Sequence, residues 1–399
     1  MSSPSWTTST RERADRRGTL SDLARLTKNR LTVFVAGPGS GEGIAVALPT
    51  RGWVLVDGCK TREKYPLREL FKRYRRGDDD HIECFVWTHP HLDHSGGVAR
   101  LVAEEEPRRI CLTGISAEAT LASIYEQLRR ASRLVTSEHQ KAGPVLQAVN
   151  AINRHLADNP RSLLALRDGV SLPLSTSEVC ITTRAPDLGG LQGWLEQNAT
   201  ADDFIRNSNA ISAVLEIAFG KTRVVLGGDL PRLRSLGKHP VPTGWNSVIG
   251  RHGQLGNHAG LKLPHHGSAE AFHPALHAAA GDARAWWITP FNSASLPRIA
   301  DLDGLPRLLK RTSAIELTAL PASRAVQRQA PPNGVVRLRN IVPRGPRAGP
   351  GGMTLKVRAV YVKPEHEPEP LEPVWCTEFD DEGHVTGRYR GEVALEVRP

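Results

Sequence analysis

The sequence lacks any run of about eighteen apolar residues, the length that a membrane-spanning helix needs. The first 20 residues contain no apolar core of the kind that a secretory signal peptide requires. Internal repeats of the solenoid type are absent as well. We therefore expect a soluble, cytoplasmic protein without a membrane partner.

Cysteine is scarce, and its pattern excludes two common kinds of site. The five cysteines are an odd number and are widely scattered, so they do not indicate a disulfide framework. None belongs to a CxxC pair, which argues against a zinc site built from thiolates. Most lie among apolar residues, as Cys180 does between Val179 and Ile181. We expect reduced, buried thiols.

Acidic residues are outnumbered by basic ones. Lys and Arg total 52 against 42 Asp and Glu, which gives a formal net charge of +10 and an isoelectric point near 9.6. An excess of positive charge favours polyanionic partners such as nucleic acid. The alternative is that the arginine content reflects genome base composition and carries no information about partners.

Three regions of the chain differ in composition. Residues 1–29 are rich in Ser, Thr and Arg and are predicted to form a disordered basic tail with a short helix near residues 20–26. Residues 30–325 alternate strand-like and helix-like patterns and can bury a sizeable core. Residues 326–399 hold Pro- and Gly-rich segments around two β-like runs. There we expect either a small β appendage or edge strands on the main domain, and a site for a protein partner.

The highest concentration of residues that can bind a metal follows the apolar run Ile82–Trp87. Within six residues the chain then carries three histidines and one aspartate, namely His89, His91, Asp93 and His94. A buried strand would deliver these side chains together onto a loop at its end. Imidazole nitrogen and carboxylate oxygen suit Zn, Mn or Fe, and the first two residues can face one ion while the last two face another. A surface loop with four ligand-type residues at this spacing is the weaker reading.

Two further strand-like runs end in ligand-type residues. The run 222–226 is followed by two glycines and Asp229, a good candidate for a carboxylate that bridges two metal ions. The run 261–264 leads directly into His265 and His266. Because strand ends often converge at one edge of a sheet, we expect these groups to share a site with the first cluster.

Residues 37–43 contain four glycines and resemble a loop that binds phosphate. They lack the GxGxxG spacing and the GK[ST] ending, and strand rather than helix follows them. We therefore predict a turn between two antiparallel strands.

These features are similar to those of the metallo-β-lactamase superfamily, whose HxHxDH hallmark is matched by residues 89–94. Within it, the sequence most resembles the soluble metallo-hydrolase domain of the DNA-internalisation competence protein. The shared motifs are Asn-x-x-Ser at residues 209–212, Gly228-Asp229 after a hairpin, and Leu-Lys-x-x-His-His-Gly-Ser at residues 261–268. The resemblance covers roughly residues 31–300.

The resemblance implies an α/β fold, specifically an αββα sandwich of two mixed β-sheets flanked by helices. It also implies a hydrolytic site at the rim with one or two ions of Zn or Mn per chain. In the implied arrangement His89 and His91 hold the first ion, and Asp93 and His94 hold the second. The carboxylate of Asp229 bridges the two ions. In chain order the implied metal ligands are His89, His91, Asp93, His94, Asp229 and one of His265 and His266.

One ligand expected from the superfamily is missing. Many members supply a further histidine to the first ion, from the interval between the opening motif and the bridging aspartate. Here that interval offers only His139 and His155, which lie in a helical stretch without a supporting motif. Asn209, Asp202 and Asp203 are the alternatives.

The predicted function is metal-dependent hydrolysis of phosphodiester bonds, as in a nuclease or phosphodiesterase, with DNA as the favoured partner. Asp93 would orient the attacking hydroxide, and whichever of His265 and His266 is not metal-bound would donate a proton to the leaving group. Residues 289–297 lack the His-Pro of relatives of the competence protein, and the resemblance implies that either a substrate contact or a proton donor is absent there. Two alternatives stay open: hydrolysis of a small ester, lactone or phosphocholine-type substrate, and a nucleic-acid-binding scaffold with a degenerate metal site.

Overall fold

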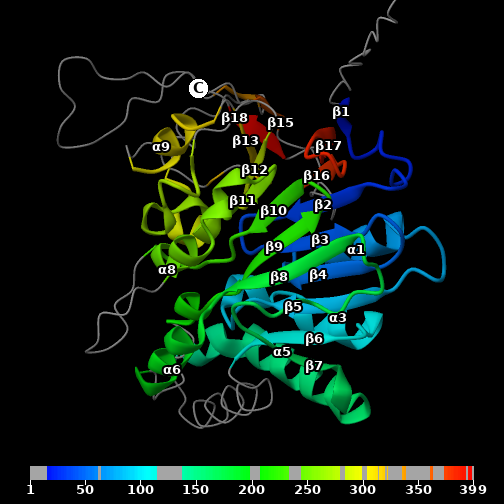
Figure 1. The fold of residues 1–399 in the computed structure, drawn as a ribbon, viewed down its shortest axis with the longest axis vertical. Coiled ribbons are helices and arrows are strands. Elements are labelled where there is room, and N and C mark those ends of the chain that lie inside the picture. Colours follow the sequence, from blue (N-terminus) through cyan, green and yellow to red (C-terminus); the bar gives the residue numbers. More distant parts are fainter. Residues whose placement is uncertain are drawn as a thin grey trace, which may run out of the picture.

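The structure is a computed structural model, and its described residues form two β-sheets packed face to face with helices on both outer sides (Figure 1). The described residues are 16–61, 64–114, 137–197, 207–232, 244–278, 284–298, 303–312, 314–319, 321, 335–337, 360–362, 373–391 and 394–397.

The larger sheet has nine strands within these residues, in the order β1-β17-β16-β2-β3-β4-β5-β6-β7. Strands β2, β3 and β4 are antiparallel neighbours, whereas β4, β5, β6 and β7 run parallel, so the sheet is mixed. Every residue of β2 to β5 is buried because both faces of the sheet are covered. The strands span Arg16–Thr19 (β1), Leu31–Ala36 (β2), Gly43–Ala47 (β3), Trp53–Asp57 (β4), Ile82–Trp87 (β5), Ile110–Thr113 (β6), Leu163–Leu166 (β7), Val374–Phe379 (β16) and Val385–Arg390 (β17).

The smaller sheet has seven strands in the described part of the chain, in the order β18-β13-β12-β11-β10-β9-β8. Strands β10 to β13 run parallel, and β8, β9 and β18 are antiparallel to their neighbours. The strands span Val179–Ala185 (β8), Val214–Phe219 (β9), Thr222–Leu226 (β10), Gly260–Lys262 (β11), Ala285–Ile288 (β12), Ile315–Leu317 (β13) and Leu395–Val397 (β18).

The helices are mostly amphipathic and begin where the sequence favours it, as α1 does with Pro at its first position. The α-helices span Pro66–Tyr74 (α1), Leu92–Ser95 (α2), Val98–Glu105 (α3), Ser137–Asp158 (α5), Leu188–Gln197 (α6), Gly244–Arg251 (α8) and Leu305–Leu309 (α9). Short 3₁₀ helices span Pro160–Ser162, Ser208–Ile211, Gly253–Asn257, Pro264–Gly267, Ala269–Ala271 and Asn292–Ala294.

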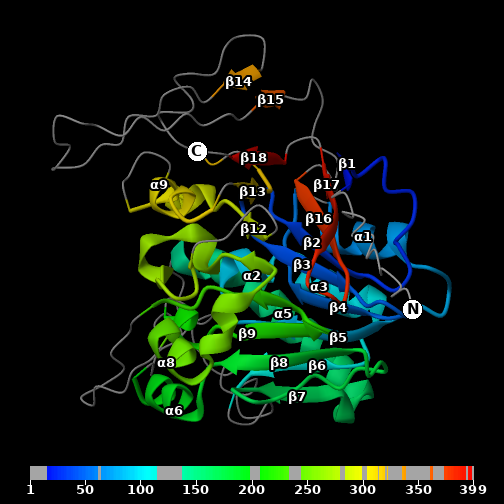
Figure 2. The same ribbon diagram turned by 45° about the horizontal axis from the view of Figure 1, so that its top comes forward.

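Three hydrophobic clusters define four layers. The middle cluster consists of strand and loop side chains from both sheets, such as Val33 from β2 and Trp287 from β12. On the outer face of the larger sheet, α1, α3 and α5 contribute Leu70, Val102 and Val149. On the outer face of the smaller sheet, α8 and α9 pack with side chains such as Trp245. The αββα sandwich of two mixed sheets is confirmed, and Figure 2 shows the same layering from a second direction.

The N-terminal segment differs from the disordered tail predicted for residues 1–29. Residues 1–15 lie outside the described part, but Arg16–Thr19 form β1, which pairs with β17. Residues 20–26 are not helical; instead Leu20, Leu23 and Leu26 are buried in the core of the larger sheet. The tail was mispredicted because its leucines are few and its strand partner is at the far end of the chain.

The C-terminal segment does not form a separate appendage where it is described. Strand β16 pairs along its whole length with β2, so it extends the larger sheet, while β18 extends the smaller one. The indole of Trp375 in β16 donates a hydrogen bond to the carbonyl of Leu317 in β13, at 2.8 Å, and so joins the two sheets. Strands β14 and β15, at Val335–Arg337 and Val360–Val362, form a pair of their own. In the described residues 373–391 and 394–397, the strands β16, β17 and β18 pack on the main domain as edge strands of its two sheets.

The cysteine prediction holds for four of the five residues. Cys59, Cys84, Cys111 and Cys376 are free and buried. Cys180 is also free but exposed, because it lies on β8, an edge strand whose neighbouring apolar residues face the other way. No described helix has the length and apolar character needed to cross a membrane.

Candidate metal centre

The expected site residues meet where strands of both sheets end. Asp57 is the last residue of β4, and the HxHxDH motif follows β5. On the other sheet, Asp229 follows β10, His266 follows β11, and Thr289 follows β12. Because β4 and β5 are parallel and β10, β11 and β12 are parallel, each sheet presents its carboxyl ends to the same place.

The HxHxDH loop turns sharply after β5 into the short helix α2. His89, Asp93 and His94 are buried, whereas 25% of the His91 side chain is exposed. Nδ1 of His91 is hydrogen-bonded to Oδ1 of Asp93. The loop therefore points four ligand-type side chains toward one region, as the spacing predicts.

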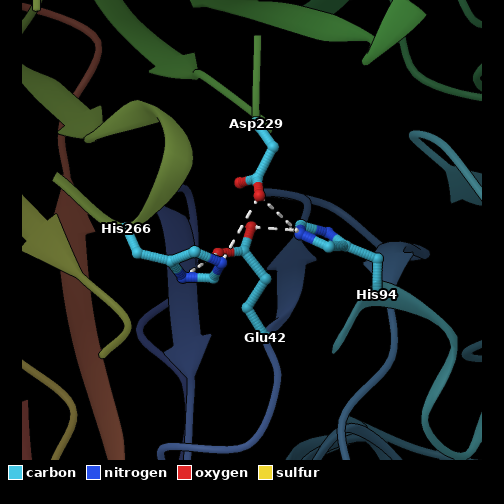
Figure 3. Close-up of side chains that lie close together, drawn as sticks. All are labelled: Glu42, His94, Asp229 and His266. Atoms are coloured by element: carbon cyan, nitrogen blue, oxygen red, sulfur yellow. Dashed lines mark ion pairs between the residues drawn. The ribbon is translucent and has the colours of Figure 1, made fainter. Parts of the chain in front are cut away.

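Figure 3 shows Asp229 together with Glu42, His94 and His266, whose carboxylate oxygens and imidazole nitrogens lie within 4.8 Å of one another. The Oδ2 atom of Asp229 is 3.3 Å from Nε2 of His94 and 3.4 Å from Nε2 of His266. Oδ2 of Asp93 is 2.8 Å from Nε2 of His266 and 3.8 Å from Nε2 of His94. The structure therefore brings together three of the predicted strand ends, and of the histidine pair it is His266 that faces the carboxylates.

The opposite nitrogen of each buried imidazole is engaged by the protein. Nδ1 of His94 donates to Oδ2 of Asp57 at 2.7 Å, and Nδ1 of His266 donates to the carbonyl of Thr289 at 2.8 Å. Nδ1 of His89 lies 3.0 Å from the hydroxyl of Thr88. Partners of this kind fix the tautomer and orientation of histidines that bind metals, because they leave Nε2 with a free lone pair.

The free atoms fit a divalent cation. Nε2 of His89, Nε2 of His94 and Oδ1 of Asp229 are buried and accept or donate no hydrogen bond. Unpaired buried polar atoms are costly unless a ligand satisfies them. Imidazole nitrogens together with carboxylate oxygens form the donor set that Zn and Mn prefer.

The electrostatics of the cluster also favour bound positive charge. Burial alone would lower the pKa of His266, but Asp229 and Asp93 raise it to about 10. In the same way burial would lower the pKa of His94, whereas Asp229 and Asp57 hold it well above its usual value. Burial would raise the pKa of Asp93, yet His94 and His266 hold it well below its usual value. A divalent cation would meet the same excess of carboxylate charge and leave the imidazoles neutral.

His265 occupies a different position from its neighbour. Its side chain is only partly buried, and its Nε2 atom lies 3.3 Å from Nδ2 of Asn209, which donates to it. Its Nδ1 atom is 3.1 Å from the hydroxyl of Ser268. Burial lowers the pKa of His265. Both His265 and His266 have left-handed backbone conformations, with φ of 48° and 54°, which turn the two rings in different directions.

Two buried acids in the site were not among the predicted site residues. Asp57 orients His94, and its only sequence signal is an acid at the end of an apolar run before a glycine. Glu42 lies in the glycine-rich turn between β2 and β3, which pair antiparallel as predicted. A Cβ atom at Gly41 would lie 2.5 Å from the carbonyl oxygen of Asp93, so only glycine lets this turn pack against the HxHxDH loop.

Of the alternative ligands predicted for the first ion, the structure describes the side chains of only His155 and Asn209. Asp202 and Asp203 lie outside the described residues, and the side chain of His139 does too. His155 lies on α5, and the charges that act on it are Glu106 and Asp158, so it is not part of the cluster. The amide oxygen of Asn209 is buried without a hydrogen bond, and Asn209 remains a candidate.

No other described histidine of the loop that follows Asp229 belongs to the cluster. His239 lies outside the described part of the chain, and His252 is partly buried and bonded to Asp168 at 2.8 Å. His258 is buried rather than exposed, because its Nδ1 donates to the carbonyl of Leu255 and its Nε2 accepts from Trp286. It is satisfied within the core and is not a ligand.

Comparisons with known proteins agree with this geometry. A family model described as the metallo-beta-lactamase superfamily matches residues 38–147, which include the HxHxDH loop. None of the curated proteins matches the sequence.

Several solved structures match parts of the chain at low identity. One is a metallo-beta-lactamase from Staphylococcus aureus subsp. aureus COL, with 10% identity over 50% of this chain and 44% of that chain, at a TM-score of 0.28. A second is MEM-A1, a subclass B3 metallo-beta-lactamase from a soil metagenome library, with 11% identity over 63% and 84% of the two chains and a TM-score of 0.33. A third is yeast PDE1, with 11% identity over 58% and 74% and a TM-score of 0.32. The chain thus spans less than half the length of the Staphylococcus aureus protein.

Proposed function

We propose that this chain, a metal-dependent hydrolase with the metallo-beta-lactamase fold, cleaves phosphodiester bonds with water activated by one or two divalent cations. The observation that carries the proposal is the convergence of His94 and His266 on Asp229, with the Nε2 atoms of both histidines within 3.4 Å of its Oδ2 atom and Asp93 2.8 Å from Nε2 of His266. These groups come from both sheets and are buried together.

Three of the proposed ligands have free atoms, namely Nε2 of His89, Nε2 of His94 and Oδ1 of Asp229. The full set is the one that the resemblance to the metallo-β-lactamase superfamily implies. His89 and His91 would hold a first ion, and the pair Asp93 and His94 a second, with the remaining ligands being Asp229 as the bridge and His266. Zn and Mn are the metals that this donor set favours. A bound cation of this kind lowers the pKa of water toward 7 and stabilises negative charge on a phosphoryl oxygen.

The protein's own groups orient the reaction. Asp57 and Thr289 fix the rings of His94 and His266, so that neither has to reorganise when charge develops. Asp93 is held from both sides by His91 and His266 and is placed to orient the attacking water. We assign His265 to proton donation toward the leaving group, because it is partly exposed and its ring does not face the carboxylates.

The preference for a phosphodiester is supported by charge. The chain carries a formal net charge of +10. Lys60, Arg232 and Arg298 are exposed and lie in loops that follow Asp57, Asp229 and Thr289. Basic side chains near the mouth of a site favour a polyanion over a neutral ester.

The motifs shared with the competence protein support nucleic acid, DNA in particular, as the substrate. All three of these motifs supply groups in the centre: Ser212 approaches Nδ1 of His89 at 3.2 Å, the glycine-aspartate motif supplies Asp229, and the His-His motif supplies His266. A cytoplasmic location and a protein partner at the C-terminal segment are further parts of this proposal.

The proposal is tested with purified protein from which metal has been removed and then restored as Zn or Mn. Bis(p-nitrophenyl) phosphate, single- and double-stranded DNA, RNA, a p-nitrophenyl carboxylic ester, a lactone and p-nitrophenylphosphorylcholine form the substrate panel. We expect turnover of the phosphodiesters only when metal is present. Turnover of the ester, lactone or phosphorylcholine substrate alone would overturn the substrate assignment, and salt-dependent DNA binding without turnover of any substrate would overturn the enzymatic one.

A further inference from the structure

A buried ion pair between Glu42 and Lys262 lies next to His94 and His266 and has no role in the proposed reaction. Oε2 of Glu42 is 2.6 Å from Nζ of Lys262, and the exposed fractions of the two side chains are 1% and 0%. Burying two charges costs desolvation free energy that their attraction often fails to repay, so apolar residues of similar volume are frequently the more stable choice. Stability alone is therefore a poor reason for this pair.

The pair is connected to His266 through one residue. Oε2 of Glu42 also accepts a hydrogen bond of 2.6 Å from the hydroxyl of Thr289. The carbonyl oxygen of the same Thr289 accepts the hydrogen bond from Nδ1 of His266. The network thereby ties together the glycine-rich turn, strand β11 and the end of β12.

Glu42 and Asp229 approach different nitrogens of the two imidazoles. The carboxylate of Glu42 is 3.8 Å from Nδ1 of His94 and 3.5 Å from Nδ1 of His266, whereas Asp229 faces Nε2 of both rings (Figure 3). One of its oxygens is already bound by Lys262 and Thr289. Glu42 is therefore placed to act on the Nδ1 side of both rings, and its Oε2 atom, bonded to Lys262 and Thr289, does not have the free valence that Oδ1 of Asp229 has.

We propose that the Glu42–Lys262 ion pair positions His266: it anchors Thr289, whose carbonyl keeps Nδ1 protonated and Nε2 directed to the metal. This inference rests on the proposed metal centre. Lys262 neutralises the charge of Glu42, so the carboxylate attracts neither the cation nor the His266 ring. The carboxylate still accepts the hydrogen bond from the hydroxyl of Thr289 and so fixes the position of that residue. Groups that orient a ligand in this way typically change metal affinity by about 10- to 100-fold when removed.

The decisive variant replaces both members of the pair, as Glu42→Leu/Lys262→Met. Each single change would leave one buried charge without its partner and would destabilise the fold. The double change removes both charges, so we expect its melting temperature to stay close to that of the wild type in the metal-free state. We expect the dissociation constants for Zn and Mn to rise by about 10- to 100-fold, measured by competition with a chromogenic chelator.

A matched control is available in the buried pair of Glu316 and Arg388, which joins β13 to β17 away from the centre. The double variant Glu316→Leu/Arg388→Met removes an ion pair of the same kind. We expect it to leave both metal dissociation constants unchanged, whatever it does to the melting temperature. Equal losses of affinity in the two double variants would show a general packing effect and overturn the proposal.

A second test does not depend on the folding of the double variant. Thr289→Val removes the hydroxyl that Glu42 accepts from and keeps the ion pair, while Thr289→Ser keeps the hydroxyl. We expect weaker metal binding in the valine variant and rescue in the serine variant. Wild-type affinity in Thr289→Val, or in the folded Glu42→Leu/Lys262→Met variant, would overturn the positioning role.

The outcome is separable from that of the proposed function, because metal affinity is measured without substrate. Loss of affinity in the double variant alongside no phosphodiester hydrolysis by the wild type would support the positioning role and overturn the proposed function. Unchanged metal affinity in the double variant alongside phosphodiester hydrolysis by the wild type would overturn the positioning role and support the proposed function. Failure of the wild type to bind either metal would overturn both.

Discussion

Asp93 and His266 are 173 positions apart in the sequence, yet Oδ2 of Asp93 lies 2.8 Å from Nε2 of His266. The contact joins the end of β5 in the larger sheet to the end of β11 in the smaller one. A side chain from each sheet is therefore needed to complete the centre, and the packing of the sandwich determines the distance between the ligands.

The first prediction separates the two adjacent histidines. His266→Ala removes an Nε2 atom that faces Asp93 and Asp229, so metal affinity should fall by more than about 100-fold, beyond the usual loss for an outer partner. His265→Ala should retain metal while losing turnover, because its ring faces Asn209. Metal content by mass spectrometry of the native protein checks both. Loss of metal in His265→Ala with retention in His266→Ala would reverse the assignment.

A second prediction concerns the glycine-rich turn. Gly41→Ala places a Cβ atom 2.5 Å from the carbonyl oxygen of Asp93, so the turn or the HxHxDH loop must move. We expect weaker metal binding and reduced turnover. Gly77→Ala is the matched control, since a Cβ atom there meets nothing within 4 Å. Equal metal affinities for the two alanine variants would show that the close packing of the turn has no role in the centre.

The third prediction concerns the exposed basic residues Lys60 and Arg232, in the loops that follow Asp57 and Asp229. Lys60→Ala and Arg232→Ala should raise KM for DNA and leave turnover of bis(p-nitrophenyl) phosphate nearly unchanged, because the small substrate does not reach along the rim. Each change should lower the salt dependence of duplex binding by about one phosphate contact, a slope change of about 0.9. Arg51→Ala is a control, because Arg51 precedes β4 at the edge of the sheet opposite the centre and pairs with Asp79. Identical salt slopes for all three variants and the wild type would argue against a nucleic-acid surface at the rim.

A fourth prediction concerns stability at low pH. Burial lowers the pKa of His258 to about 4 and that of His277 to about 3. Below about pH 6.5 the unfolded chain binds protons that the folded chain does not, so the free energy of unfolding should fall as pH drops. The slope is about 1.4 kcal/mol per pH unit for each histidine until the folded pKa is reached.

The variant His277→Phe isolates this effect, because it keeps an aromatic ring against Phe272 and Trp286 but does not titrate. Urea unfolding of metal-free protein between about pH 7 and about pH 5 should show a shallower pH dependence for the variant than for the wild type. A dependence as steep as that of the wild type would mean that His277 is not held neutral in the folded state.

The ligand set was accessible from the sequence because its signals are local. Residues 89–94 combine an apolar strand with a dense run of imidazoles, and Asp229 and His266 each follow an apolar run and stand beside glycine. Each segment suggests a site without knowledge of the others. The expectation that these segments share one site came from the tendency of strand ends to converge at one edge of a sheet. The structure confirms that the side chains of Asp93, His94, Asp229 and His266 lie close together.

The supporting groups were not accessible in the same way. Glu42 has no metal-type neighbour in the sequence, and its partner Lys262 lies on the other sheet. A buried charge pair is visible only once both sheets are packed. The choice between His265 and His266 also depended on two adjacent left-handed residues, a backbone feature that residue identity does not reveal. The same non-local pairing explains why β1 was missed as part of the larger sheet and why the sequence left the position of β16 open between two alternatives.

The central claim is that the cluster around Asp229 is a hydrolytic metal centre. Its most direct test compares the wild type with Asp93→Ala/His94→Ala, both stripped of metal and restored with Zn or Mn, by metal stoichiometry and by kcat/KM on bis(p-nitrophenyl) phosphate. The account predicts one or two bound ions and metal-dependent turnover in the wild type, with at least one fewer ion and turnover reduced by more than about 1,000-fold in the double variant. Equal turnover by the two proteins, or wild-type turnover that persists after the metal is removed, would contradict it.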